Sequence, residues 1–454
     1  MDILQASRNN GLYFVHTFYS SEEGFCTQPN FSRGMLQRRY RGIRLTRAPV
    51  WAIISNSLGS KMSRHGLNRT FADSYAGELA RLDEDGLRRS LRVLPGSGGL
   101  VEIEGRRTLN FSSNDYLDLA NDPRLKRGAI DAIEQYGCGA TSSRLLAGHL
   151  DIHERLEKEL AAFVGKDTAT VFPTGFQTNV GVLTSLAGEG DVIFSDALNH
   201  ASIVDGCRLS RARVCVYRHC DMKDLERLLR TVTGTRRIIV TDTVFSMDGD
   251  LAPVREIAQL AEEFGAVFAA DEAHAIGVYG GGAGLCAEQG ASADVIVGTL
   301  SKALGGEGGF AAGPEWSKDL LINRARTFIF STGLAPACAG SALAALDVVR
   351  NDNDLGPELL ARAATFRQRL RELGVGVPDD RSQIVPLVIG ENNSAMDLAA
   401  SLLERGVLAA AVRPPSVPKG TARLRFSVTL AHERHDLDAT AEVVADSVMR
   451  VQRA

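Results

Sequence analysis

The sequence predicts an α/β fold, in which a large domain built on a mostly parallel β-sheet precedes a smaller α+β C-terminal domain. Two observations lead to this prediction. From about residue 150 onward, short apolar runs alternate with amphipathic stretches of helical period, whereas after about residue 345 long charged helices dominate. Apolar runs without polar alternation are typical of parallel strands that helices cover on both faces.

Six apolar runs are predicted to be strands of the large sheet: 169–172, 192–194, 214–217, 238–241, 266–270 and 295–297. Between them, the stretches 225–232 and 254–264 have the apolar spacing of amphipathic helices. In the C-terminal domain we expect a helix at 357–373, a strand at 384–389, a helix at 395–405, a strand at 423–428 and a final helix from Asp436.

The segment before the sheet divides into two parts. Residues 1–61 mix aromatic, arginine and polar residues without a sustained period, and we interpret them as an N-terminal extension of unknown order. Residues 62–115 are expected to form an arm with a helix at 71–91, whose apolar positions share one face. The large domain is then predicted at 116–345 and the small domain at 346–454.

The composition of the 454 residues is that of an ordinary globular protein, with 44% hydrophobic and 23% charged residues. A formal net charge of -4 gives no overall positive field for nucleic acid or an anionic membrane. The longest early apolar stretch, 48–54, is too short to cross a bilayer, and the chain start lacks a signal-peptide layout. The seven cysteines form no CxxC pair and no metal-like spacing. We therefore expect a cytoplasmic protein without a metal, a nucleic-acid partner or a membrane partner.

Polar residues gather where the predicted strands end. They are Asp196, Asn199 and His200 after the second run, Ser246 after the fourth, Asp271 and His274 after the fifth, and Thr299, Ser301 and Lys302 after the sixth. Because ligands of open α/β sheets bind outside the carboxyl ends of the strands, this distribution predicts a ligand site at that edge.

Lys302 differs from the other lysines of the chain. There are eight lysines, and seven of them lie in polar surroundings typical of solvated surface. Lys302 instead stands between a buried strand and a glycine-rich turn at 305–309, where desolvation and neighbouring cations would lower the pKa of its amine. Such an amine is a nucleophile. The alternative interpretation is a surface lysine on a loop.

Asp271 ends a buried strand upstream of Lys302, and this pair suits pyridoxal phosphate. That cofactor acts as an electron sink while its ring nitrogen stays protonated, which an adjacent ionised carboxylate ensures. Alternatively, Asp271 caps the next helix. The string DEAH at 271–274 also suggests a nucleoside triphosphatase, but the GxxxxGK[ST] loop that this function needs is absent. A dinucleotide-like GxGxxA match at 282–287 follows a glycine-rich loop instead of a strand, which argues against that function.

A phosphate group requires donors without bulk, and the sequence offers them on two sides. Thr174, Gly175 and Phe176 follow the first strand and precede a helical run at 179–187, so the N–H groups of a helix start can bind phosphate there. Thr299 and Ser301 supply hydroxyl groups after the sixth strand. Each of these groups is common in loops when taken singly.

Five motifs occur in order along the chain: NDYL at 114–117, SDALNHASIVDG at 195–206, VFSMDGD at 244–250, DEAHAIG at 271–277 and TLSKALG at 299–305. Together they resemble the α-oxoamine synthases, which are fold-type-I pyridoxal-phosphate enzymes. The resemblance runs from about Phe71 to the C-terminus with consistent spacing, and residues 1–61 have no counterpart. It implies a fold-type-I acyltransferase that binds pyridoxal phosphate and forms a homodimer with active sites at the subunit interface.

The resemblance also implies a role for individual positions. Lys302 would carry the cofactor as a Schiff base and act as the base on the substrate Cα, Asp271 would pair with the ring nitrogen, and His200 would stack on the ring. Further cofactor contacts would come from Gly175, Phe176, Ser246, His274 and Thr299, while Ser331 and Thr332 would reach the phosphate of the neighbouring subunit. The substrate would be bound by Arg88, Asn114, His200, Ser416 and Arg425, with Arg425 on the amino-acid carboxylate.

The reaction that the resemblance implies joins an amino acid to an acyl thioester and then releases carbon dioxide. The loop RPPSVP at 413–418, followed by GTARLR at 420–425, resembles the branch of the family that uses L-alanine and a pimeloyl thioester in biotin synthesis. The stretch at 195–206 occurs equally in glycine-using branches, so glycine with an acetyl or other acyl donor is the alternative. Pimeloyl-CoA and a pimeloyl carrier protein are both possible donors.

Several residues depart from the family pattern. Asp118 stands where glycine is usual, and Phe176 stands where tyrosine is common. Thr243 and Cys220 are unusual, and Glu307 adds a charge to the glycine turn. If position 118 requires a positive φ, aspartate adopts it at some cost. These departures leave the catalytic residues in place and bear on substrate choice and rate.

Overall fold

The computed structural model describes the backbone of residues 64–453 and the side chains from 71 to 450. The chain divides into two units, 1–73 and 74–454, and helix α2 (Arg64–Glu84) spans the boundary. The prediction for residues 1–61 lies outside the described residues. The fold described below is that of the second unit.

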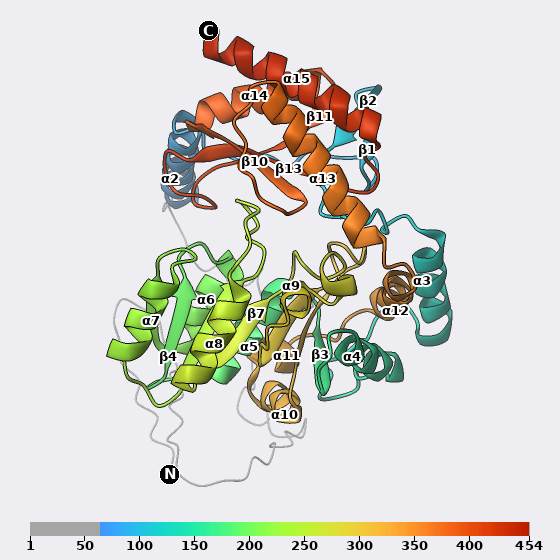
Figure 1. Cartoon of the computed structure of the whole chain (residues 1–454), viewed down its shortest axis with the longest axis vertical. Coiled ribbons are helices and arrows are strands. Elements are labelled where there is room, and N and C mark those ends of the chain that lie inside the picture. The colour runs from blue at the N-terminus through green and yellow to red at the C-terminus, as the bar shows by residue number, and fades with distance from the viewer. Residues whose placement is uncertain (1–63, 454) are drawn as a thin grey trace, which may run out of the picture. The chain divides into compact units, whose positions relative to one another are not determined.

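A seven-stranded sheet forms the centre of the large domain (Figure 1). Its strands, in order across the sheet, are β3 (Thr168–Phe172), β9 (Gly309–Gly313), β8 (Val295–Thr299), β7 (Val267–Asp271), β6 (Arg237–Asp242), β4 (Val192–Asp196) and β5 (Arg213–Tyr217). The pairs from β8 to β5 are parallel, and β9 runs antiparallel between β3 and β8. The mostly parallel sheet and all six predicted strands are therefore confirmed.

Strand β9 was not predicted, because the sequence GFAAG lacks the branched residues typical of strands and its first glycine was assigned to the turn. Only glycine fits at position 309, because the neighbouring atoms leave no space for a side chain. A Cβ on Gly309 would lie 2.7 Å from the backbone nitrogen of Gly175. The strand therefore lies unusually close to the start of helix α5 (Gly175–Leu186).

Helices cover both faces of this sheet, as the alternation along β6 shows. Ile238 and Val240 belong to one cluster of buried residues and Ile239 to another. The first cluster includes residues of α5, α6 (Ala201–Ser210), α10 (Glu315–Arg324) and α11 (Arg326–Ile329). The second includes residues of α4 (Asp151–Phe163), α7 (Met222–Thr231), α8 (Val254–Phe264), α9 (Leu285–Gln289) and α12 (Pro336–Asn351). Because both faces are buried, the strands show no polar alternation.

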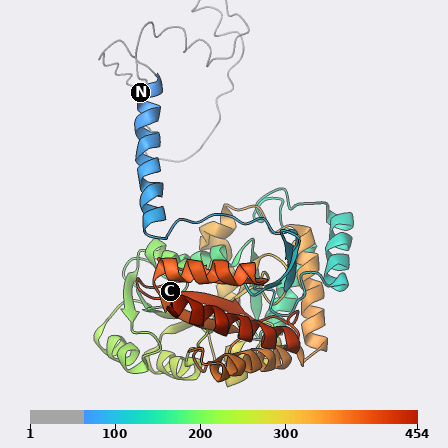
Figure 2. The same cartoon turned by 90° about the horizontal axis from the view of Figure 1, so that it is seen from above.

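The small domain contains an antiparallel sheet in the order β10 (Ile384–Gly390), β13 (Ala422–Ser427) and β12 (Ala410–Val412). Its helices are α13 (Leu355–Glu372), α14 (Asn392–Glu404) and α15 (Arg434–Arg453). Helices α14 and α15 lie side by side, in orange and dark red in Figure 2. The predicted α+β elements are confirmed within three residues at the ends where bounds were predicted. Among the described residues, no helix combines the length and apolarity needed to cross a membrane.

Five further elements complete the second unit. Strands β1 (Leu100–Ile103), β2 (Arg106–Asn110) and β11 (Val407–Leu408) form a small sheet that joins the arm to the C-terminal domain. Helix α3 (Pro123–Tyr136) packs on α12, and a single 3₁₀ turn, η1, covers Gly280–Gly282. The predicted domain boundaries at 115 and 345 stay predictions.

The predicted helix at 71–91 is wrong in its last third. Helix α2 ends at Glu84, and Gly86 follows with φ +61°, a left-handed conformation that glycine adopts without strain. The apolar positions beyond it are not part of a buried helical face, since Leu91 is fully exposed at 101%. Tyr75 and Leu79 are also exposed. The apolar spacing in the sequence therefore continues beyond the end of the helix at Glu84, which is why the predicted helix was too long.

Candidate active site

A cavity of about 230 Å³ lies at the carboxyl edge of the seven-stranded sheet. Seven of the predicted site residues line it: Gly175, Phe176, His200, Asp271, His274, Thr299 and Lys302. They come from the ends of β7 and β8, the starts of α5 and α6, and the turns that follow these strands. The sheet edge therefore brings together residues that lie far apart in the sequence.

Lys302 follows β8 on a turn whose backbone is fixed. Its carbonyl oxygen accepts the N–H of Gly305 at 2.9 Å. Desolvation by burial lowers the pKa of Lys302 to about 8, although the nearby carboxyl groups of Asp271 and Asp242 act to raise it. An amine with this pKa is partly unprotonated near neutral pH and can act as a nucleophile.

Asp271 is buried at the end of β7 and receives two N–H donors. The side-chain amide of Asn179 donates to Oδ2 at 2.6 Å, and the backbone N–H of Ala273 donates to Oδ1 at 2.9 Å. Hydrogen bonds of this kind stabilise an ionised carboxylate. Asp271 therefore presents a fixed negative charge to the cavity that it shares with Lys302.

His200 is the N-cap residue of α6, so its backbone and ring are both held. Its N–H donates to Asp242 Oδ2 at 2.7 Å, and its ring Nδ1 lies 2.7 Å from Ser202 Oγ. Burial lowers the pKa of His200, with Asp271 acting against this and Lys302 adding to it. The ring is therefore neutral at physiological pH, and a neutral ring can lie against an aromatic cofactor without adding charge.

A chain of polar contacts links the cavity to the small domain. The Nδ1 atom of His274 lies 2.7 Å from the hydroxyl oxygen of Tyr116. Arg425, on β13, donates to the same hydroxyl at 3.2 Å and to Asn114 Oδ1 at 3.0 Å. The Nε atom of Arg425 is buried without a hydrogen-bond partner among the described residues. Because a buried guanidinium normally satisfies its donors, this atom favours a site for a carboxylate.

The phosphate side is formed by the first turn of α5 and the hydroxyl of Thr299. Thr174 caps this helix, accepting the N–H of Gln177 at 3.2 Å, and the N–H groups of a first turn have no acceptor within the helix. A Cβ placed on Gly175 would point toward Thr299 Oγ1 at 3.4 Å. Because Gly175 has no side chain, a concave space remains between the first turn of α5 and the hydroxyl of Thr299. An amine, a carboxylate and this space in one cavity fit pyridoxal phosphate.

Seven predicted site residues do not line the cavity: Arg425 and Asn114, whose contacts are described above, and five others. Ser246 lies four residues beyond β6 and is half-buried. Ser331 Oγ accepts the side-chain N–H of Gln177 at 3.5 Å, and Thr332 pairs with Ser143 in an isolated bridge. The remaining two are Arg88 and Ser416, both exposed.

Arg88 and Ser416 belong to neighbouring segments although their side chains stay outside the cavity. Arg88 forms an exposed ion pair with Asp83 at 2.5 Å. Arg413, buried at the start of the loop that carries Ser416, donates to the backbone carbonyl of Arg88 at 3.4 Å and to that of Gly86. The two predicted substrate contacts therefore sit on one joined surface, and their role stays a prediction.

The departures from the family pattern have distinct structural settings. Asp118 does have a positive φ of 56°, as does Cys220 at 52°, so both positions adopt a conformation that favours glycine. The hydroxyl of Thr243 is buried and donates to Glu272 Oε2 at 2.7 Å. Phe176 lines the cavity with its side chain 47% exposed, and Glu307 is exposed.

Sequence reasoning overlooked three residues of the site. Asn179 and Asp242 line the cavity, and Tyr116 connects His274 with Arg425. Asn179 lies in α5 next to the polar residues Gln177 and Thr178, so no sequence signal distinguished it. Asp242 directly follows the predicted strand at 238–241 just as Asp271 follows the one at 266–270, so the strand-end argument covered this position but was not applied to it.

The second acidic residue of the DEAH string has a structural role. Glu272 is buried and accepts the backbone N–H groups of Leu285 at 2.9 Å and Cys286 at 2.8 Å. These bonds hold the turn that carries the GxGxxA match. The DEAH string and the GxGxxA match therefore both have a structural explanation that involves no nucleotide.

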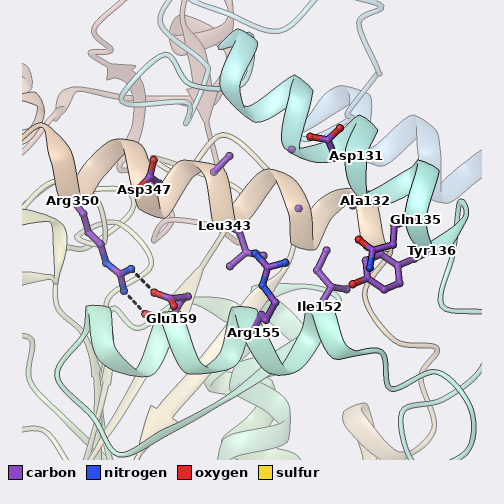
Figure 3. Close-up of a pocket in the computed structure, with 13 residues that line it drawn as sticks. Asp131, Ala132, Gln135, Tyr136, Ile152, Arg155, Glu159, Leu343, Asp347 and Arg350 are labelled. Carbon is purple, nitrogen blue, oxygen red and sulfur yellow. Dashed lines mark hydrogen bonds and ion pairs between the residues drawn. The ribbon is translucent and has the colours of Figure 1, made fainter.

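A larger cavity of about 550 Å³ lies between α3, α4 and α12 (Figure 3). Its charged residues include Arg350, which donates to Glu159 Oε2 at 2.5 Å, as the dashed lines in Figure 3 show. None of the predicted site residues lines it, and its lining contains no lysine, histidine or cysteine. The smaller cavity at the sheet edge is therefore the candidate active site.

Comparisons with known proteins show the family of the chain. The family model for class I and II aminotransferases matches residues 106–444. A relative from Geobacter sulfurreducens named 8-amino-7-oxononanoate synthase is 49% identical over 381 residues, which cover 82% of this chain and 97% of the relative.

Solved structures are similar over most of the chain. A serine palmitoyltransferase variant from S. paucimobilis with a bound PLP–myriocin aldimine has a TM-score of 0.80 at 28% identity, covering 85% of this chain and 99% of the other. An 8-amino-7-oxononanoate synthase from Francisella tularensis has a TM-score of 0.66 at 28% identity, covering 76% and 98%. The fold-type-I expectation is confirmed by these similarities.

Proposed function

The chain belongs to the class I and II aminotransferase family and, within it, to the 8-amino-7-oxononanoate synthases, and from this membership we propose its reaction. It condenses L-alanine with a pimeloyl thioester, with loss of carbon dioxide, to give 8-amino-7-oxononanoate for biotin synthesis. The observation that carries the proposal is the 49% identity to a relative of that name over 82% of the chain. Eight curated relatives at 44% to 49% identity share the name, so the glycine-using alternative is not retained.

Pyridoxal phosphate is the cofactor in this proposal, and when bound it supplies an electron sink for charge that develops at the substrate Cα. Lys302 would hold it covalently, Asp271 would face its ring nitrogen, and His200 would lie against the ring. Further contacts would come from His274 at the 3′-oxygen, from Gly175, Phe176 and Thr299 at the phosphate, and from Ser246. The depressed pKa of Lys302 supports this assignment, because an unprotonated amine is required.

The chain's own residues orient the amino acid and move its protons. Arg425 would bind the carboxylate through its unpartnered Nε–H, while hydrogen bonds from its Nη2 atom to Asn114 and Tyr116 hold the guanidinium in place. Lys302, once released, takes the Cα proton as a general base and later returns a proton to the same carbon. A C–C bond forms to the acyl carbon, the C–S bond breaks and releases the thiol, and the bond from Cα to the carboxylate then breaks as carbon dioxide leaves.

A homodimer is part of the proposal. The isolated bridge between Ser143 and Thr332 places two loops side by side, and both carry exposed apolar side chains. Leu146 is 81% exposed and Phe330 is 70% exposed. Contact with a second copy would bury this surface and bring Ser331 and Thr332 toward the neighbouring phosphate. We also place the protein in the cytoplasm, because the six cysteines of the described residues are free thiols.

The experiment that tests the function is a product assay with purified chain and pyridoxal phosphate. L-alanine is combined in separate reactions with pimeloyl-CoA and with a pimeloyl carrier protein, and the products are identified by mass spectrometry. Glycine with acetyl-CoA is the matched comparison. Formation of 8-amino-7-oxononanoate with either pimeloyl donor supports the proposal and identifies the donor. A product from glycine and acetyl-CoA, without one from L-alanine, contradicts it.

A further inference from the structure

A second carboxyl group lies beside Asp271 in the cavity, and no predicted role accounts for it. Asp242 ends β6 as Asp271 ends β7, and the two residues are register partners on adjacent parallel strands. Adjacent strands lie about 4.8 Å apart. Both residues are buried, at 3% and 4% exposure, and both line the cavity that holds Lys302. Two carboxyl groups so close in a desolvated site cannot both ionise without a large repulsion.

The hydrogen bonds distinguish the two groups. Asp271 accepts two N–H donors on two different oxygens, from Asn179 and Ala273. The Asp242 side chain accepts one N–H, from His200, at its Oδ2 atom. Its Oδ1 atom has no hydrogen-bond partner in the part of the chain that the structure describes. This atom is not fully buried, since it does not belong to the fully buried side-chain atoms that lack a partner. Because N–H donors favour the ionised form, the negative charge belongs on Asp271 and the proton on Asp242.

The other charged groups that face Asp242 agree with this division. They are Asp196 on β4, Asp271 on β7 and Lys302 after β8, while the neutral His200 at the start of α6 contributes its backbone N–H. Asp196 and Asp271 both disfavour a further negative charge. The Lys302 cation acts the other way, but it interacts more strongly with Asp271 than with Asp242. Burial, followed by the charge of Asp271, raises the pKa of Asp242 well above its ordinary value.

We propose that Asp242 is a functional carboxylic acid of the active site, which holds a proton while Asp271 stays ionised and which positions His200 through its backbone N–H. The inference rests on the proposed function, because the ring of His200 matters there for its place against the cofactor. When Asp242 is neutral, Asp271 is the one ionised carboxylate of the pair, and its negative charge is balanced by the Lys302 cation. Asp242 is thus a positioning residue that also sets the charge of the cavity.

Two substitutions separate the parts of this proposal. Asp242→Asn keeps the shape and an oxygen that can accept the His200 N–H, but it cannot ionise. Asp242→Ala removes the acceptor as well. If Asp242 is neutral, we expect D242N to retain a kcat/KM near neutral pH that is about tenfold or more above that of D242A, because only D242A lacks an acceptor for the His200 N–H. The wild type should also lose activity at alkaline pH through ionisation of Asp242, and this limb should be absent from the D242N profile.

A measurement on the cofactor-free chain gives a readout that does not depend on activity. The infrared difference spectrum between wild type and D242N near neutral pH should contain the C=O band of a protonated carboxylic acid, lost in the variant. Carboxylate bands in its place would overturn the proposal, as would a D242N variant as impaired as D242A. This spectrum remains decisive if the wild type forms no 8-amino-7-oxononanoate, so failure of the proposed function and failure of this inference are distinguishable.

Discussion

The cofactor side and the substrate side of the active site are constructed differently. Lys302, Asp271 and Thr299 all lie at or just beyond the ends of adjacent strands in one sheet, and all line one cavity. Apart from His200, the residues predicted for the substrate come from the arm, a loop and a strand of the small domain. Of these, Arg425 and Asn114 contact each other, whereas Arg88 and Ser416 are exposed.

This difference shows which parts of the site are preformed. Strand ends are fixed by the ladder of the sheet, so side chains there need little reorganisation to bind a ligand. The segment around Ser416 lies at the surface and outside the cavity, so we expect binding of an acyl donor to require a change in the arm, the loop or both. We therefore expect the cofactor side to govern chemistry, and the substrate side to govern affinity and choice of acyl donor.

The largest expected effect on activity comes from a substitution of Lys302, on the cofactor side. Substitution by alanine removes the amine that would hold the cofactor and move the Cα proton. We expect product formation to fall by about 10³-fold or more. The measurement is the initial rate of 8-amino-7-oxononanoate formation, with Lys223→Ala on the exposed start of α7 as the matched control. Equal rates for K302A and K223A would contradict the assignment.

Arg425 tests the substrate side. Arg425→Ala should raise the KM for L-alanine by about 10- to 100-fold, because a charge-assisted bond to the carboxylate is lost, while cofactor binding stays unchanged. Arg434→Ala, at the exposed start of α15, is the control. If R425A instead lost the cofactor, the separation between the two sides of the site would be wrong.

Gly309 tests the preformed phosphate region. A Cβ there would lie 2.5 Å from Thr178 Oγ1 and 2.7 Å from Gly175, so Gly309→Ala must push the start of α5 away from β9. We expect about tenfold weaker binding of pyridoxal phosphate, measured by titration of the cofactor-free chain. Gly306→Ala adds the same methyl group where the nearest atom is 3.4 Å away, and it should change the affinity little. Similar affinities for both variants would contradict the account of this region.

The sequence revealed most of the cofactor side because its signal is local. A polar residue after an apolar run is visible without knowledge of the fold, and this rule found Lys302 and Asp271. The supporting contacts are not local. Asn179 reaches Asp271 across 92 residues, and Tyr116 reaches His274 across 158. No pattern in either segment reveals its partner, and β9 was overlooked because its place in the sheet depends on close packing with α5 instead of strand propensity.

The smallest expected effect concerns stability and lies outside the cavity. The ring of His219 is held between Asp196 at 2.9 Å and Asp250 at 2.7 Å. Burial alone would lower the pKa of His219, but the two carboxyl groups outweigh it and raise the pKa to about 12. The charged ring therefore ties the end of β4 to the loop that carries Ser246.

Loss of this charge should destabilise the fold in a pH-dependent way. Because the folded pKa is raised above the unfolded value of 6.5, the contribution is complete below about pH 6.5 and declines as pH rises toward about 12. His219→Gln should lower the free energy of unfolding by about 2 kcal/mol near pH 6 and by less near pH 9, measured by denaturant titration. His435→Gln, with its side chain 72% exposed, is the control. A difference that does not shrink with pH would show that His219 acts without its charge.

The most direct test of the central claim is to locate the cofactor on the chain. Purified protein is loaded with pyridoxal phosphate, reduced with borohydride, digested and mapped by mass spectrometry. The account predicts one pyridoxyl group, on Lys302, which L-alanine added before reduction diminishes. A group on another lysine, or none on Lys302, would contradict it.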